Sequence, residues 1–127
     1  MIKTEFSRAV CLFAALTLFA FAACNRTAGP PPPLAVEQIP AEMEKVYGKA
    51  TQEDKDMVGR LNSALQNKDY PAAYQFVQAL CNTPVATKEQ RMTSVRAMLT
   101  ITSLLQTAQA QGDQNAAAVL SFQKRNR

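Results

Sequence analysis

The chain is predicted to form an all-α domain: a small antiparallel bundle of four to five helices that follows an apolar leader and a proline-rich stalk. Three observations support this fold class. Between residues 41 and 122, apolar side chains recur at helical spacing, helix-capping residues separate the segments, and no run alternates apolar with polar residues as a half-buried strand does. Without the leader, the remaining chain is long enough for one such domain.

The first 23 residues have the organisation of a secretory signal peptide. Lys3 and Arg8 supply positive charge, and an uncharged, mostly apolar run from 9 to 23 ends in two alanines before Cys24. This run is shorter than the roughly 20 residues that a membrane-spanning helix needs, which disfavours an uncleaved anchor. We therefore predict that residues 1–23 are removed on export.

The end of this segment, Phe21-Ala22-Ala23-Cys24, resembles the lipobox of bacterial lipoproteins, in which the cysteine after the cleaved bond carries the lipid. The family usually has leucine in place of Phe21, so ordinary cleavage after Ala22 and release of a soluble protein is the alternative. The resemblance implies a diacylglyceryl group on Cys24, usually with an amide-linked chain, and two or more chains hold a protein stably on a bilayer. It implies an exported protein whose domain faces the periplasm or the exterior, with Asn25 slightly favouring the outer membrane over the inner.

Residues 24–40 are predicted to be a linker that begins with the lipidated cysteine. This segment holds most of the seven prolines of the chain, including four in succession from Pro30. Proline fixes φ, lacks an amide donor and favours extended polyproline II. We therefore expect a semi-rigid stalk between the membrane and a helical domain at 41–122.

Caps and apolar stripes predict the first three helices. Pro40 suits the first turn of one helix, Thr51 the N-cap of a second, and Tyr70-Pro71 the start of a third. Their predicted buried faces are, in order, Met43, Val46, Tyr47 and Ala50; Met57, Val58, Leu61, Ala64 and Leu65; and Ala73, Phe76, Val77 and Leu80. Phe76 lies in the middle of the most apolar of these stripes, so its replacement by alanine should cost about 3–5 kcal/mol if it is fully buried.

Two further helices complete the predicted bundle. Thr87 and Gln90 match a capping box, from which a long helix runs to about Ala110, and Gly112 and Asp113 then stop it and cap the last helix. The stripe of the long helix is Met92, Val95, Leu99, Thr102 and Leu105, widened by Met98, Ile101 and Ala108. The last helix carries Ala116, Ala117, Val119 and Leu120. The wide stripe predicts that the long helix packs on two neighbours.

Residues 68–73 and 112–117 share a turn, an acidic cap and paired alanines at the same offset. Each joins two predicted helices, and residues 51–120 thereby resemble weakly the helical hairpins of tetratricopeptide repeats. The resemblance implies that Ala73 and Ala117 allow paired helices to approach closely. The spacing of 44 residues departs from the 34 of that family, and an ordinary helical hairpin needs the same turn chemistry.

The charge of the chain is unevenly placed. The net charge is +4, but the predicted domain is close to neutral, because Lys124, Arg125 and Arg127 contribute most of the excess. We assign residues 123–127 to a solvated basic tail. A nucleic-acid partner would require a basic face, and none is predicted.

The residue inventory predicts no enzyme, cofactor, metal site or small-molecule substrate. The chain has no histidine, the commonest general base and metal ligand. The carboxylates Glu53, Asp54 and Asp56 follow a cap and are expected to be solvated. After removal of the leader and lipidation of Cys24, Cys81 is the remaining thiol; a buried small hydrophobe is favoured over pairing between chains.

Two classes of function remain. One is a tethered helical adaptor that binds an unidentified envelope protein through an exposed groove. The other is a structural, self-associating envelope lipoprotein without a dedicated ligand. An exposed apolar patch on the domain would favour the adaptor, and a uniformly polar surface with a symmetric self-contact would favour the structural role.

Overall fold

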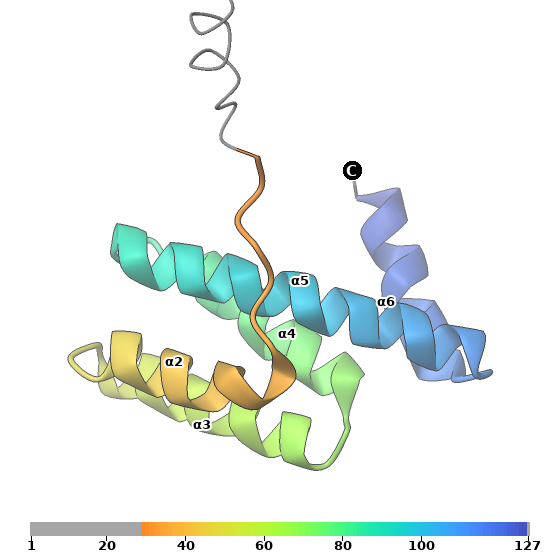
Figure 1. Ribbon diagram of the computed structural model, residues 1–127, viewed down its shortest axis with the longest axis horizontal. Helices are drawn as coiled ribbons and strands as arrows, with labels where there is room; N and C mark the ends of the chain where they lie inside the picture. Colours follow the sequence, from red (N-terminus) through yellow and green to blue (C-terminus); the bar gives the residue numbers. More distant parts are fainter. Residues whose placement is uncertain (1–28, 127) are drawn as a thin grey trace, which may run out of the picture. The chain divides into compact units, whose positions relative to one another are not determined.

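The computed structural model describes residues 29–126, and in this part of the chain the regular secondary structure is helical, with no strand. The all-α class is therefore confirmed (Figure 1). A short 3-10 helix precedes five α-helices: η1 (Val36–Gln38), α2 (Ile39–Tyr47), α3 (Gln52–Gln66), α4 (Tyr70–Cys81), α5 (Lys88–Ala110) and α6 (Gln114–Arg125). All of them belong to one packed unit, Pro32–Arg127.

Helices α2 and α3 have the buried faces that the sequence predicts. Ile39, Met43 and Tyr47 of α2 are fully buried, and Val46 and Ala50 pack partly buried against the same core. The predicted residues of α3 also form core: Val58, Leu61, Ala64 and Leu65 are buried and Met57 is partly so. The predicted buried faces of α2 and α3 are therefore confirmed. In both helices the large apolar side chains lie on a single face, which makes the buried face predictable from the sequence.

The predicted caps of α3 and α4 are present. The Thr51 hydroxyl accepts a hydrogen bond from the Asp54 amide (3.2 Å), and the Asp69 carboxylate accepts one from the Ala72 amide (3.2 Å). Lys68, in the turn between the two helices, has a φ of 55°. This left-handed residue lets the chain reverse within a short turn, so that α4 returns along α3.

The buried face of α4 differs from the predicted one at one residue. Ala73, Val77 and Leu80 are buried as predicted, but Tyr74 completes the face and Phe76 is only half-buried. Tyr74 and Phe76 flank the stripe on opposite sides, because successive helical residues differ by about 100°. The neighbouring helices cover the side of Tyr74, so Phe76, which was predicted to lie on the buried face, packs only partly buried against the core.

Helix α5 has the predicted capping box and length but turns a different face to the core. The Gln90 amide donates to the Thr87 hydroxyl (3.1 Å), and the Thr87 amide donates to the Gln90 side chain (2.8 Å). The buried residues are Gln90, Thr93, Ser94, Ala97, Ile101, Leu105 and Ala108. Of the predicted stripe and its widening, Leu105, Ile101 and Ala108 are buried, whereas Met92 is 44% exposed and Leu99 is 40% exposed.

The small residues of α5 explain this orientation. Helix α5 contacts α2, α4 and α6, so its inner face must accept several neighbours. Ser94 and Ala97 allow the helices to approach closely, and Ser94 meets the hydroxyl of Tyr47 from α2. The predicted packing on more than one neighbour is confirmed, but it uses the small side chains and leaves part of the large apolar stripe outside.

The last helix begins where the sequence predicts. Gly112 has a φ of 95°, a conformation that favours glycine, and the Asp113 carboxylate accepts hydrogen bonds from the amides of residues 115 (2.9 Å) and 116 (3.1 Å). Ala116 and Leu120 are buried, whereas Ala117 and Val119 are half-buried. Helix α6 continues to Arg125, so part of the segment assigned to a basic tail forms its last turn.

The end of the predicted linker belongs to the folded unit. Leu34 is only 5% exposed, its amide donates to the Arg96 carbonyl (3.5 Å), and its carbonyl accepts a hydrogen bond from the Thr100 hydroxyl. Arg96 Nε donates to the Pro32 carbonyl (2.8 Å). Residues 32–35, here named the strap, thus run across α5 before η1 begins (Figure 1).

Candidate functional site

The acidic side chains and the thiol of the described residues do not gather into a metal-binding cluster. Among residues 29–126, no group of three His, Cys, Asp or Glu side chains is placed to hold a metal ion. The carboxylates near the start of α3 are separated by orientation: Glu53 and Asp56 are exposed, while Asp54 is buried and accepts a hydrogen bond from the Thr51 hydroxyl (3.0 Å). Asp54 is therefore part of the cap and not, as expected, a solvated carboxylate.

A groove lies between α3 and α4. It has a volume of about 620 Å³. Seven residues line it: Glu53, Asp56, Met57, Arg60, Gln75, Phe76 and Ala79. A second hollow continues it along the same helix pair and shares Asp56, Arg60 and Phe76 with the first. The two hollows make one surface, here named the α3–α4 groove.

The α3–α4 groove combines an apolar floor with a charged rim. Met57 and Phe76 are half-buried, so each packs against the core and also presents apolar surface to the groove. The rim carries the exposed charges of Glu53, Asp56 and Arg60, and Asp56 accepts a hydrogen bond from the side chain of Gln52 (2.8 Å). A concave apolar surface with a few polar groups at its edge is typical of binding sites.

The residues that line the α3–α4 groove follow from the face that α4 buries. Because Tyr74 turns into the core, Phe76 lies at the edge of the stripe, beside α3. The groove was not predicted from the sequence, because Met57 and Phe76 both have the spacing of core residues. The sequence contains one indication of the groove: Met57 lies next to the charged residues of the first turns of α3, at the border of the apolar face.

Cys81 lies in a smaller cleft formed by α4, α5 and α6. The cleft has a volume of about 250 Å³, and Tyr74, Met98 and Phe122 contribute to its walls. Cys81 is half-buried, so the predicted burial is found only in part. Burial nevertheless raises the pKa of Cys81 above its ordinary value, because desolvation disfavours the thiolate.

Cys81 is accordingly expected to react slowly with a maleimide in the native protein and rapidly in denaturant. The folded chain holds the proton of the Cys81 thiol more tightly than the unfolded chain does. As the pH rises, the thiol of the unfolded chain therefore ionises first, near the ordinary pKa of 9.0. The stabilising contribution of this group is therefore present below that pH and is lost as the pH rises. Reaction rates across pH check the shift, with Cys81→Ser as the unreactive control. A disulfide-linked dimer that Cys81→Ser abolishes would contradict it.

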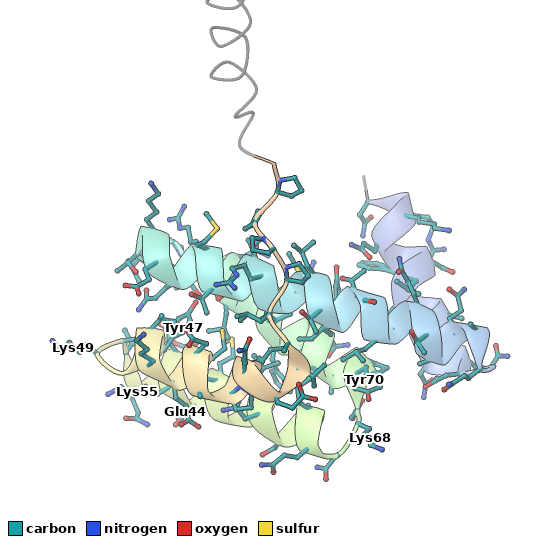
Figure 2. The ribbon with its side chains drawn as sticks, in the orientation of Figure 1. Glu44, Tyr47, Lys49, Lys55, Lys68 and Tyr70 are labelled. Carbon is teal, nitrogen blue, oxygen red and sulfur yellow. The ribbon has the colours of Figure 1, made fainter. Side chains whose placement is uncertain are left out.

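The polar groups between α2 and α5 stabilise the fold. The hydroxyls of Tyr47 and Ser94 share a buried hydrogen bond (2.9 Å), and the Gln90 side chain donates to the Val46 carbonyl (3.1 Å). Figure 2 shows Tyr47 between the two helices. Desolvation raises the pKa of Tyr47, so its hydroxyl stays protonated as a hydrogen-bonding group.

The predicted lipidation site and signal peptide lie outside the described residues, so the lipidation of Cys24 remains a prediction. Within the described part of the chain, none of the helices has both the length and the apolar character needed to cross a membrane.

No protein-family model, curated protein or solved structure matches the chain. Of the two alanines that the repeat resemblance singles out, Ala73 is fully buried, whereas Ala116 takes the place of Ala117 at the helix contact of α6.

Proposed function

We propose that the protein is an exported adaptor, anchored to the cell envelope by lipidated Cys24, that binds a segment of an envelope protein in the α3–α4 groove. The observation that carries the proposal is the placement of Met57 and Phe76. Both present apolar surface to a groove about 620 Å³ in volume, and the fully buried core of the fold consists of other residues. Concave apolar surface of this kind is the usual basis of segment binding.

The lining of the groove defines the chemistry of the partner segment. An apolar side chain of the partner fits against Met57, Phe76 and Ala79. Glu53 and Asp56 on the rim favour a lysine or arginine near that anchor, because two carboxylates there outnumber one guanidinium. An amphipathic helix with an apolar stripe and a basic flank meets both requirements, and α3 and α4 provide parallel walls of helical length.

Site-specific photocross-linking tests the groove. Gln75 and Gln78 are exposed glutamines of α4, but Gln75 lines the α3–α4 groove and Gln78 lines the Cys81 cleft. A cross-linking amino acid at 75 is expected to capture one defined envelope protein in intact cells, and the same group at 78 should not. Phe76→Ala should weaken the capture at 75, because it removes the largest apolar wall of the groove.

Two results of this experiment would contradict the proposal. Equal capture from positions 75 and 78 would mean that the groove is not the binding surface. Cross-linked homodimers from position 75 would favour the structural, self-associating role. The anchor is read in the same cells: the wild type should incorporate a fatty-acid analogue and partition into detergent, and Cys24→Ala should do neither.

A further inference from the structure

The outer face of α5 is an apolar stripe that the folded unit does not cover. Met92 is 44% exposed and Leu99 is 40% exposed, and they lie two turns apart on the side opposite the buried Ser94 and Ile101. Val95 lies between them and is half-buried. A soluble helix ordinarily turns polar residues to this side, so the stripe presents apolar surface that a contact outside the unit can bury.

Basic side chains accompany this stripe. Lys88 precedes Met92 by one turn and Arg96 follows it by one turn, so both are its neighbours on the helix surface. Here, the outer face of α5 denotes Lys88, Met92, Val95, Arg96 and Leu99. Apolar side chains flanked by lysine and arginine are a feature that this face shares with helices that lie in a membrane interface.

Basic and acidic side chains are concentrated on different helices of the folded unit, and α5 belongs to the basic part. Within helices α5 and α6, Glu89 is the single acidic side chain, beside five basic ones: Lys88, Arg91, Arg96, Lys124 and Arg125. The carboxylates of Glu53, Asp54 and Asp56 are on α3, which makes no contact with α5. In Figure 1, α6 rises past α5 and ends on the side of α5 away from α2, so its basic last turn reinforces the charge there.

The strap ties this face to the predicted attachment point. Arg96, a residue of the outer face, donates to the Pro32 carbonyl, so the chain enters the folded unit at the edge of that face. From Cys24 to Pro32 is eight residues (32 − 24), which span about 25 Å as polyproline II and at most about 29 Å fully extended. This reach is shorter than α5 itself, whose 23 residues extend about 35 Å.

We propose that the outer face of α5 docks on the bilayer surface that holds the lipid anchor, with Met92 and Leu99 in the headgroup region and the basic side chains on anionic headgroups. The inference rests on the proposed lipidation of Cys24. A short tether keeps this face close to the bilayer, and apolar and electrostatic contacts then hold it there. The α3–α4 groove is consequently turned toward the aqueous side, where a partner can reach it.

Fluorophore labelling of the full-length, lipidated chain tests the docking. In a Cys81→Ser background, Leu99→Cys places the dye on the outer face, and Gln66→Cys places it at an exposed site on α3 as the matched control. The chain is reconstituted in phosphatidylcholine vesicles with or without phosphatidylglycerol, and lipid-linked nitroxides serve as quenchers. We expect several-fold stronger quenching at 99 than at 66 in anionic vesicles, and a decrease at 99 on Lys88→Glu.

The same samples separate failure of the docking from failure of the anchor. The Cys81→Ser parent should incorporate a fatty-acid analogue and take up no maleimide dye, because Cys24 is then in a thioether. A lipidated chain with equal quenching at 99 and 66 would overturn the docking and leave the anchor standing. A chain without fatty acid would overturn both. Self-quenching at 99 that increases with protein density would also overturn the docking, because a second copy would then cover the face.

Discussion

A chain that begins at Pro40 is expected to be much less stable than one that begins at Pro32. The shorter chain lacks Leu34 and Ile39, which are 5% and 0% exposed, and the hydrogen bonds that join the strap to α5. Burial of one such side chain stabilises a fold by about 1.5–3 kcal/mol, so the two together contribute about 3–6 kcal/mol. That is a large part of the roughly 5–15 kcal/mol typical of a whole domain.

Urea unfolding of the two chains, followed by circular dichroism, measures this difference. Within the longer chain, Leu34→Ala should lower the free energy of unfolding by about 2–5 kcal/mol. Glu37→Ala is the matched control, because its side chain is exposed and should leave that free energy nearly unchanged. Equal midpoints for the chains beginning at Pro32 and Pro40 would mean that the strap packs on α5 without stabilising it.

The strap also shows why one boundary of the domain could not be predicted from the sequence. Four successive prolines predict extended backbone, and the strap has no helix-forming pattern. The residues that hold it, Arg96 and Thr100, lie more than sixty positions further along the chain. The pattern of neighbouring residues carries no information on such a long-range contact. The only indication in the sequence that the strap is packed is Leu34, an apolar residue directly after the proline run.

Helix α5 illustrates the limit of apolar periodicity. Its caps and length were predictable because they depend on neighbouring residues, and the capping box of Thr87 and Gln90 is present. Its orientation depends on which face its partners can approach, and those partners meet Ser94 and Ala97 rather than Met92 and Leu99. A helix with large apolar residues on one side and small ones on the other has two candidate core faces, and only the packing of α2 and α4 selects between them.

The α3–α4 groove was unpredictable for a related reason. Met57 and Phe76 are apolar residues at helical spacing, and such residues are usually core. Each lies at the edge of its stripe, where coverage depends on a neighbouring helix. In this fold α5 contacts α4 but not α3. The face of the α3–α4 pair that carries the groove is therefore left uncovered by α5. The same packing that buries Tyr74 therefore leaves the groove.

The largest single-residue effect on stability is expected at Tyr47. Its side chain is the largest of those that are fully buried, at 1% exposure, and it joins α2 to α5. Tyr47→Ala should lower the free energy of unfolding by about 3–5 kcal/mol through the cavity alone. It also leaves the Ser94 hydroxyl without its partner inside the core, which adds about 1–3 kcal/mol. Thermal unfolding should therefore show a protein that is barely folded or unfolded.

A double-mutant cycle separates the hydroxyl pair from the ring and keeps the prediction testable if Tyr47→Ala does not fold. Tyr47→Phe and Ser94→Ala each leave one buried hydroxyl unpaired, so each should cost about 1–3 kcal/mol. The double variant removes both hydroxyls and should cost less than the sum of the two single changes, because no unpaired group remains. Strict additivity in urea unfolding would show that the two hydroxyls do not stabilise one another.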